Sequence, residues 1–152
     1  MKSVCMGGTF DVFHAGHEVL IQRALDVSEH VLIGLTTDER AGKGRTGSVI
    51  IPYAQRKSGL EHWLRSKGVK QRVEIVPLND DWGPAALGED FEGIIVSVET
   101  EGMARALNQV REGKGVDKLE VIVVPIVMAY DGHRISSSRI RNGEINSEGL
   151  RT

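Results

Sequence analysis

The stretch of sequence that decides the fold is GGTFDVFHAGH, residues 7–17. It follows the apolar run Lys2–Met6, which predicts a buried strand, and precedes Gly16–Ser28, whose apolar residues have helical spacing. In open α/β sheets, ligands bind at such a turn between strand and helix, where backbone N–H groups and the helix dipole point at phosphate. The stretch therefore predicts a nucleotide-phosphate site at the end of the first strand.

Strand and helix patterns alternate along the rest of the chain. Apolar or β-branched runs predict strands, and apolar residues at helical spacing predict helices. Further strands are expected over 31–36, 72–78, 93–98 and 119–127, further helices over 52–67, 102–112 and 136–143, and loops over 38–48 and 79–88. This alternation predicts an α/β fold with a doubly wound, parallel, five-stranded sheet, formed as a single domain over residues 1–152.

The composition limits the kinds of partner. The chain has 152 residues, a net charge of −2 and 40% hydrophobic residues, which gives no general reason to expect a nucleic acid or a membrane as partner. The single cysteine, Cys5, cannot form an intramolecular disulfide and fits a reducing compartment. No apolar run approaches the ~20 residues of a membrane span, and no signal peptide precedes the first strand, so we expect a cytoplasmic protein.

His14 and His17 lie three residues apart at the start of a predicted helix, so both can face the same side. A metal site is one alternative, but no third ligand stands at a suitable spacing. Capping or packing of the helix is another alternative. The glycines favour a third: Gly7 and Gly8 permit close approach of a ligand to the backbone, and Gly16 removes bulk between the imidazoles. We therefore expect two imidazole donors in a polyphosphate cradle.

The segment Ile135–Arg139, with three consecutive serines, begins the last predicted helix. Taken alone, the serines are equally well explained as an ordinary helix N-cap. The segment follows the end of another strand, however, and can therefore face the same crevice as the histidines. The hydroxyls, Arg139 and the helix dipole would then bind the β- and γ-phosphates.

Basic residues gather in the glycine-rich loop, at Arg40, Lys43 and Arg45. Lys43 can reach over a bound phosphate, and the alternative is a solvated surface loop, as most charge clusters are. Arg56, in the first turns of the next helix, is a candidate for binding a second anionic substrate. The adjacent acids at 80–81 resemble a metal pair, although neighbouring loop acids are usually solvated.

Three common motifs are absent. Gly42-Lys43 lacks the preceding glycine and the following hydroxyl of a P-loop. No Gly-x-Ser-x-Gly elbow occurs, which counts against an α/β-hydrolase. The first turn also lacks the Gly-x-Gly-x-x-Gly spacing of dinucleotide-binding proteins.

Together these residues resemble the HxGH nucleotidyltransferase superfamily, in which Gly-Thr-Phe-Asp…His-x-Gly-His and a C-terminal Ile-Ser-Ser-Thr/Ser segment hold a nucleoside triphosphate. Within it, the chain is similar to the archaeal and eukaryotic type of phosphopantetheine adenylyltransferase. The points of similarity are 7–17, 36–39 with Lys43, Arg56, 96–100, Asn108, Arg111, 131–132 and 135–145. Residues 129–135 replace the Arg-Thr-x-Gly-Ile-Ser-Thr of cytidylyltransferases, which argues against CTP, and Ser138 stands where threonine is more usual.

The resemblance implies a Rossmann-like nucleotidyltransferase fold and the reaction of ATP with 4′-phosphopantetheine to give dephospho-CoA and pyrophosphate, with Mg²⁺ carried by ATP and no protein ligands for it. It implies that His17, secondarily His14, and Lys43 are catalytic, and that Thr9, Lys43 and Arg56 contact the acceptor. The implied ATP-binding residues are Gly8, Thr9, Phe10, His14, Gly16, His17, Ser97, Glu99, Thr100, Asn108, Gly132, Ile135, Ser136, Ser137, Ser138 and Arg139.

Two other classes of function stay open on the sequence. A sister transferase (a cytidylyltransferase, an FAD synthetase or an NMN adenylyltransferase) would share the end motifs, and a non-catalytic nucleotide sensor would keep the cradle without turnover. The presence of His14, His17, Lys43 and Arg139 argues against the sensor. The expected partners are ATP and 4′-phosphopantetheine, without nucleic acid or membrane, and the expected state is a monomer or small homo-oligomer.

Overall fold

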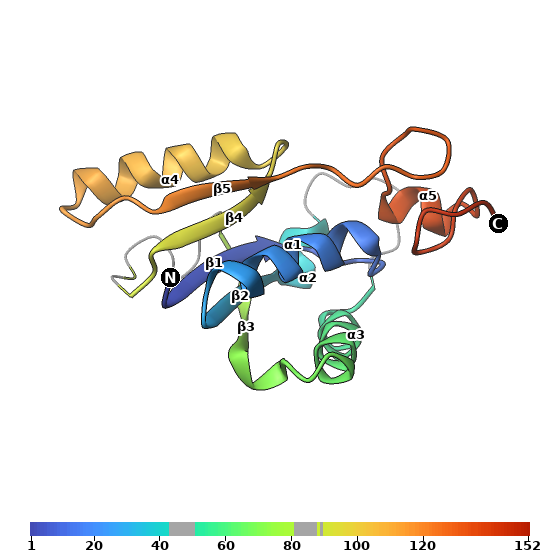
Figure 1. Cartoon of the computed structure of the whole chain (residues 1–152), viewed down its shortest axis with the longest axis horizontal. Coiled ribbons are helices and arrows are strands. Elements are labelled where there is room, and N and C mark those ends of the chain that lie inside the picture. The colour runs from blue at the N-terminus through green and yellow to red at the C-terminus, as the bar shows by residue number, and fades with distance from the viewer. Residues whose placement is uncertain (43–50, 81–87, 89) are drawn as a thin grey trace.

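The computed structural model describes residues 1–42, 51–80, 88 and 90–152. A parallel five-stranded sheet lies at its centre in the order β3-β2-β1-β4-β5 (Figure 1). The strands are β1 (Ser3–Gly8), β2 (His30–Thr36), β3 (Val73–Leu78), β4 (Gly93–Ser97) and β5 (Glu120–Val124). The helices are α1 (Ala15–Val27), α2 (Asp38–Gly42), α3 (Tyr53–Ser66), α4 (Glu101–Gly113), α5 (Ser137–Arg141) and the 3₁₀ turn η1 (Lys70–Arg72). Among the described residues, no helix has both the length and the apolarity needed to cross a bilayer.

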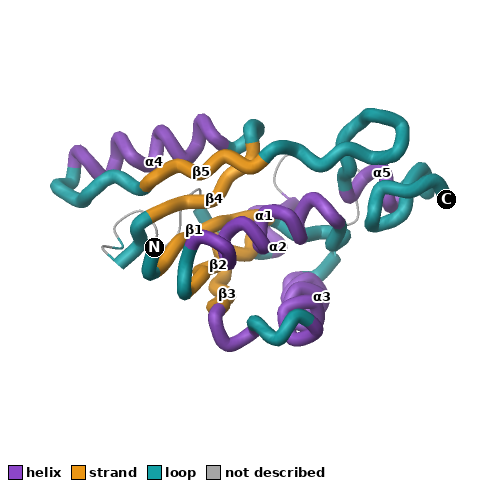
Figure 2. The backbone as a smooth tube through the Cα atoms, viewed as in Figure 1, coloured by secondary structure: helices purple, strands orange, loops and turns teal. Residues whose placement is uncertain are grey.

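The chain winds outward from β1 in two directions. β2 and β3 lie on one side of β1, and β4 and β5 lie on the other. The connections place α1 and α3 on one face of the sheet and α4 on the opposite face (Figures 1 and 2). The predicted doubly wound parallel sheet is therefore confirmed. Because all five strands run in parallel, the carboxyl ends of β1, β2 and β4 meet at one edge of the sheet.

Alternate residues of β1 build two separate apolar cores, because successive side chains of a strand point to opposite faces. Val4 and Met6 pack in a large cluster with α1 and α3, to which those helices contribute Ile21 and Leu60. Cys5 faces the other way and packs in a smaller cluster that includes Leu107 of α4. A helix layer thus covers each face and leaves the carboxyl edge to the loops.

Element boundaries differ from the sequence expectation at several places. β1 continues through Gly8, so the turn to α1 begins only at Thr9. The expected loop after β2 begins instead as the short helix α2, and its remainder lies outside the described residues. β5 ends at Val124, where a longer strand was expected, because the next residue is Pro125, which has no N–H to continue the ladder.

The α4 side of the core provides a test of the packing. Leu107 is completely buried, so Leu107→Ala removes its apolar contacts and leaves a cavity beneath α4. We expect the free energy of unfolding to fall by about 2–5 kcal/mol, as measured by urea denaturation. The control Val19→Ala, at a position that is 41% exposed on α1, should change it by less than about 0.5 kcal/mol. Equal effects of the two substitutions would contradict this packing.

Candidate active site

The turn between β1 and α1 places an aromatic residue in an unusual backbone conformation. Phe10 has φ 48°, in the left-handed region that non-glycine residues rarely adopt. Its ring is buried and lies against the His17 ring, with 4.8 Å between centroids. Gly8 makes room for this ring, because a Cβ at position 8 would lie 3.0 Å from it. The Phe10 ring therefore packs against the His17 ring, and this arrangement requires a glycine at position 8.

The two histidines are held by backbone amides of their own helix start. His14 is the N-cap of α1, and its Nδ1 accepts a hydrogen bond from the Gly16 N–H at 3.0 Å. The Nδ1 of His17 accepts from the His14 N–H at 3.2 Å. The rings stack with centroids 3.8 Å apart. Since each Nδ1 is an acceptor, each neutral ring carries its proton on Nε2.

Both imidazoles are uncharged at neutral pH. Burial lowers the pKa of His14 from 6.5 to about 4, with a smaller contribution from the charge of Arg134. Burial likewise lowers the pKa of His17 to about 3, and the neighbouring His14 adds to the shift. The pair therefore presents two neutral Nε2–H donors, which suit the oxygens of a polyphosphate. Within the described part of the chain, no three His, Cys, Asp or Glu side chains cluster as metal ligands.

Gly16 is required by the ring of His14. A Cβ at position 16 would lie 2.8 Å from the Cε1 atom and 3.0 Å from the Nδ1 atom of that ring. Any side chain there would displace the imidazole from the amide that it caps. The spacing of the His-x-Gly-His motif thus has a steric reason in the structure.

The serine segment lies next to the β1–α1 turn, as the sequence analysis expected. The Ser137 hydroxyl donates to the Val12 carbonyl and accepts from the Val12 N–H, both at 3.1 Å. The Ser136 hydroxyl caps α5 by accepting from the Arg139 N–H at 3.3 Å, so the N-cap alternative describes this side chain correctly. The Ser138 hydroxyl accepts from Arg141. All three hydroxyls therefore hold the segment in place.

The loop before α5 is organised by an arginine. Arg139 forms an ion pair with Asp131 and donates to the Arg134 carbonyl at 3.0 Å, and it holds the pKa of the Asp131 carboxyl below its usual range. Gly132 has φ 79°, which lets the chain turn sharply here. Ile135 is buried in a small cluster under the loop, so its side chain serves packing.

The turn after β4 contributes a further polar group to the same edge of the sheet. The Thr100 hydroxyl accepts from the Ser97 N–H at 3.1 Å, and the Ser97 hydroxyl accepts from the Glu99 N–H at 3.3 Å. Glu99 also forms an ion pair with Arg134, which links this turn to the loop before α5. Ser97, Glu99 and Thr100 therefore lie at the carboxyl edge.

Asn108 has a different position from the one expected. Its amide donates to the Leu119 carbonyl at 2.8 Å and accepts from the Leu119 N–H at 2.7 Å, just before β5 begins. These bonds join α4 to the amino end of β5, away from the carboxyl edge. Asn108 therefore anchors the helix, and the structure does not bring it to the crevice.

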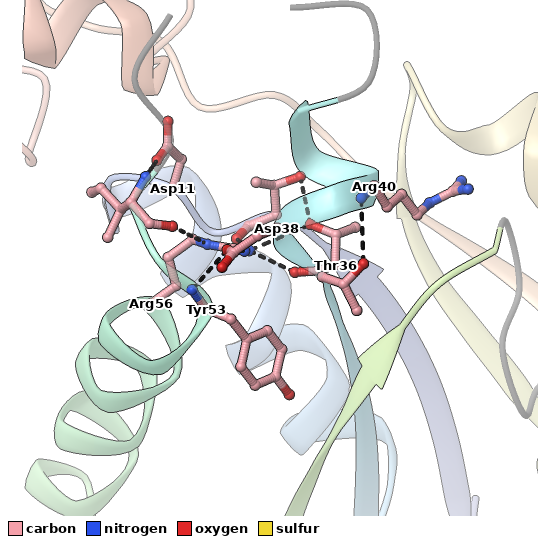
Figure 3. A network of polar contacts seen from close by, with 9 residues as sticks. Asp11, Thr36, Asp38, Arg40, Tyr53 and Arg56 are labelled. Carbon is pink, nitrogen blue, oxygen red and sulfur yellow. Dashed lines mark hydrogen bonds and ion pairs between the residues drawn. The ribbon is translucent and has the colours of Figure 1, made fainter.

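Arg56 lies in an environment that differs from the expected contact with a second anionic substrate. Its side chain has no exposed surface, and its guanidinium donates to the carbonyls of Thr9, Thr36 and Ile51 and to Asp38 (Figure 3). Every nitrogen of the guanidinium is therefore bonded within the protein. Direct binding of a second substrate's phosphate by Arg56 does not fit this environment. The other basic candidate, Lys43, lies outside the described residues, as do Arg45 and Asp81.

Asp11 and Arg141 form an ion pair beside the site, and neither was predicted from the sequence as a site residue. The Asp11 carboxylate is buried, forms an ion pair with Arg141 of α5, and accepts from the Ile51 N–H at 3.3 Å. It thereby ties α5 and the segment before α3 to the β1–α1 turn. Asp11 lies within residues 7–17 and Arg141 within residues 135–145, but no local sequence pattern reveals a pair that is 130 positions apart.

The buried histidines predict a pH dependence of stability. The folded-state pKa values lie below 6.5, so between pH 6.5 and about 4 the unfolded chain binds more protons and stability falls as pH falls. The loss approaches about 1.4 kcal/mol per pH unit for each ring. Urea denaturation from pH 7 to 5 measures this slope, and His17→Asn should reduce it. Long-range ¹H–¹⁵N NMR should show the Nε2–H tautomer for both rings. Titration midpoints near 6.5 would contradict the burial.

Solved structures share this fold. A protein of unknown function from Archaeoglobus fulgidus is 35% identical and superposes with a TM-score of 0.70, covering 80% of this chain and 97% of that one. A bifunctional NMN adenylyltransferase/ADP ribose pyrophosphatase from Francisella tularensis has a TM-score of 0.63 over 98% of this chain and 44% of its own. At 19% identity, the second similarity shows the fold alone.

The comparison of sequences identifies the family to which the chain belongs. The cytidylyltransferase-like family model matches residues 5–143. The phosphopantetheine adenylyltransferase of Methanosarcina barkeri is 45% identical, over 98% of this chain and 92% of its own length. That of Methanothermobacter thermautotrophicus is 44% identical, over 96% of this chain and 87% of its own. The chain therefore belongs to the cytidylyltransferase-like family and, within it, to the phosphopantetheine adenylyltransferases.

Proposed function

We propose that this protein transfers the adenylyl group of ATP to 4′-phosphopantetheine, giving dephospho-CoA and pyrophosphate. The observation that carries the proposal is the pair of neutral Nε2–H donors of His14 and His17 at the carboxyl end of β1. The full-length similarity to relatives named for this activity supports the choice of substrates.

The reaction needs alignment and charge stabilisation more than it needs a base. A phosphate oxygen of the acceptor forms a bond to the α-phosphorus of ATP, and the bond from that phosphorus to the bridging oxygen breaks, so that pyrophosphate leaves. The nucleophile is already an anion, and catalysis of such transfers rests on positioning and electrostatics. A site made of imidazole N–H groups and backbone amides supplies donors to the oxygens where charge develops.

In the proposed complex, each part of ATP lies against a different segment of the chain. The Nε2–H groups of His17 and His14 face the α-phosphate and the bridging oxygen. The Thr9–Phe10 turn adds donors at the same place. The loop from Gly132 to Arg139 lies beside the β- and γ-phosphates and is held against the β1–α1 turn by Ser137.

The remaining groups border the nucleoside and the acceptor. Ser97, Glu99 and Thr100 lie at the end of β4 and border the adenosine. Lys43 supplies the positive charge between the two substrates, on the evidence of the sequence alone. ATP enters as its Mg²⁺ complex, in which the phosphate oxygens hold the ion.

The choice of adenine over cytosine rests on the loop before α5. In this chain, residues 129–135 replace the Arg-Thr-x-Gly-Ile-Ser-Thr of the cytidylyltransferases of the superfamily. In this loop, Arg134 forms an ion pair with Glu99, which lies in the turn after β4 that is proposed to border the adenosine. The different loop supports ATP as the nucleotide.

Removal of one donor tests the role of the histidines. His17→Ala should lower kcat by about 10²–10³-fold, the usual effect of losing one transition-state donor, while the Kd for ATP measured by calorimetry changes far less. His62→Ala, on the exposed face of α3, is the matched control and should keep wild-type kcat. Near wild-type turnover of His17→Ala would remove His17 from the mechanism.

A substrate panel tests the reaction itself. The protein is incubated with ATP or CTP and with 4′-phosphopantetheine, glycerol phosphate, FMN or NMN, and pyrophosphate release is followed. We expect release with ATP and 4′-phosphopantetheine, because all these acceptors attack through a phosphate and only the similarity to the phosphopantetheine adenylyltransferases favours one of them. A signal with CTP, or with a different acceptor only, would replace the proposed function by that of a sister transferase. Tight ATP binding without any product would favour a sensor.

A further inference from the structure

We propose that Arg56 is a positioning residue, which holds the Thr9–Phe10 peptide so that the Phe10 N–H is presented to the phosphates, and which ties this peptide to α2 and to the start of α3. The inference rests on the proposed function for the identity of the phosphates. It assigns Arg56 to preparing the site, in place of the direct acceptor contact that the resemblance implies.

Arg56 joins separate segments of the chain at one buried point. Its Nη1 donates to the carbonyl of Thr9 at 2.9 Å and to that of Thr36 at 2.8 Å, and its Nε donates to the carbonyl of Ile51 at 2.7 Å. These carbonyls belong to the β1–α1 turn, to the end of β2 and to the residues before α3 (Figure 3). The three segments therefore cannot shift independently without breaking a buried hydrogen bond.

The hydrogen bond to Thr9 fixes the direction of the next amide. The described residues contain no cis peptide bond, so the Thr9 carbonyl and the Phe10 N–H point in opposite directions. With the carbonyl held toward Arg56, the N–H points away from it, and none of the described residues accepts a hydrogen bond from it. The Phe10 ring touches His17. Within the described part of the chain, the Phe10 amide is thus a donor without an acceptor, on the residue whose ring lies against His17.

The backbone of this turn needs such a restraint. A non-glycine residue at a φ of 48° is less favourable than one in an ordinary conformation, and it persists only where the surroundings hold it. The burial of the Phe10 ring holds one side of the peptide, and the bond from Arg56 to the Thr9 carbonyl holds the other. A bond between the Thr36 and Thr9 hydroxyls at 3.0 Å adds to the restraint.

Asp38 makes the buried charge of Arg56 possible. An unpaired guanidinium in this environment would be strongly destabilising. The Asp38 Oδ1 atom accepts from Arg56 Nη2 and from the Tyr53 N–H, both at 2.8 Å. It thus neutralises the arginine and caps the first residue of α3, while its own side chain is 58% exposed. Lysine cannot make the same contacts, since a single ammonium group does not reach the three carbonyls and the carboxylate that surround the planar guanidinium.

Steady-state kinetics of Arg56→Lys separates positioning from acceptor binding. We expect kcat to fall about 10- to 100-fold, the effect of misplacing a donor by a fraction of an ångström to an ångström, with the KM for 4′-phosphopantetheine changed by less than about twofold. The matched control is Arg72→Lys, because the Arg72 guanidinium also bonds three carbonyls, of Leu25, Ser28 and Glu29. We expect the control to lower Tm and leave kcat unchanged.

A second measurement needs neither a nucleotide nor the acceptor. Inorganic phosphate, which stands in for the α-phosphate or the acceptor phosphate, is added to the ¹⁵N-labelled full chain. It should move the Phe10 amide resonance of the wild type and of Arg72→Lys, and should leave it unmoved in Arg56→Lys at the same concentration. If the substrate panel indicates another acceptor or CTP, the proposed function fails, yet this titration still decides the role of Arg56.

Two results would overturn the inference. A large rise in the KM for 4′-phosphopantetheine with kcat retained would return Arg56 to acceptor binding. A lowered Tm with kcat and the Phe10 response both unchanged would leave it a purely structural residue. If Arg56→Lys does not fold, Asp38→Asn replaces it, since its exposed side chain permits the change. It should lower kcat in the same direction by a smaller factor, and an unchanged kcat in that variant would count against the proposal.

Discussion

The position of β1 between β2 and β4 is the constraint on which the rest of the structure depends. β2 and β3 lie on one side of β1, and β4 and β5 lie on the other; α1 and α3 cover one face of the sheet, and α4 covers the opposite face. Ligands bind at such a switch point because backbone amides are exposed there. The β1–α1 turn, the turn after β4 and the loop before α5 all lie at this edge, although they are far apart in sequence.

The site combines neutral donors with charges that are already paired. His14 and His17 contribute N–H groups without charge, because burial keeps both rings deprotonated. The arginines around them have acidic partners: Arg56 with Asp38, Arg141 with Asp11, and Arg139 with Asp131. These ion pairs hold backbone segments in place, so that the amides and imidazoles keep their directions before a ligand arrives. Preorganised donors of this kind lower the cost of reorganisation during reaction.

Local patterns predicted the parts of the molecule that depend on local physics. Alternating strand and helix periods gave the sheet and its helices, and Gly16 between two histidines gave the cradle, because these depend on spacing within a few residues. The predicted end of a strand was wrong where one residue interrupts the pattern: β5 was expected to reach residue 127, but it ends at Val124, before Pro125. Asn108 was misplaced for a related reason: its amide is bonded to a backbone group brought near by the sheet, which helical spacing does not reveal.

By itself, the sequence determined the class of fold, and it predicted a phosphate site at the end of β1 with His14 and His17 as its donors. Only the tertiary structure decided which charged residues are available to a ligand. The sequence predicted that Arg56 contacts the acceptor, yet the fold buries its guanidinium among three carbonyls and a carboxylate. The physical reason is that burial and pairing depend on which segments the sheet brings together. Residues distant in sequence, such as Asp11 and Arg141, meet only after the strands have taken their order.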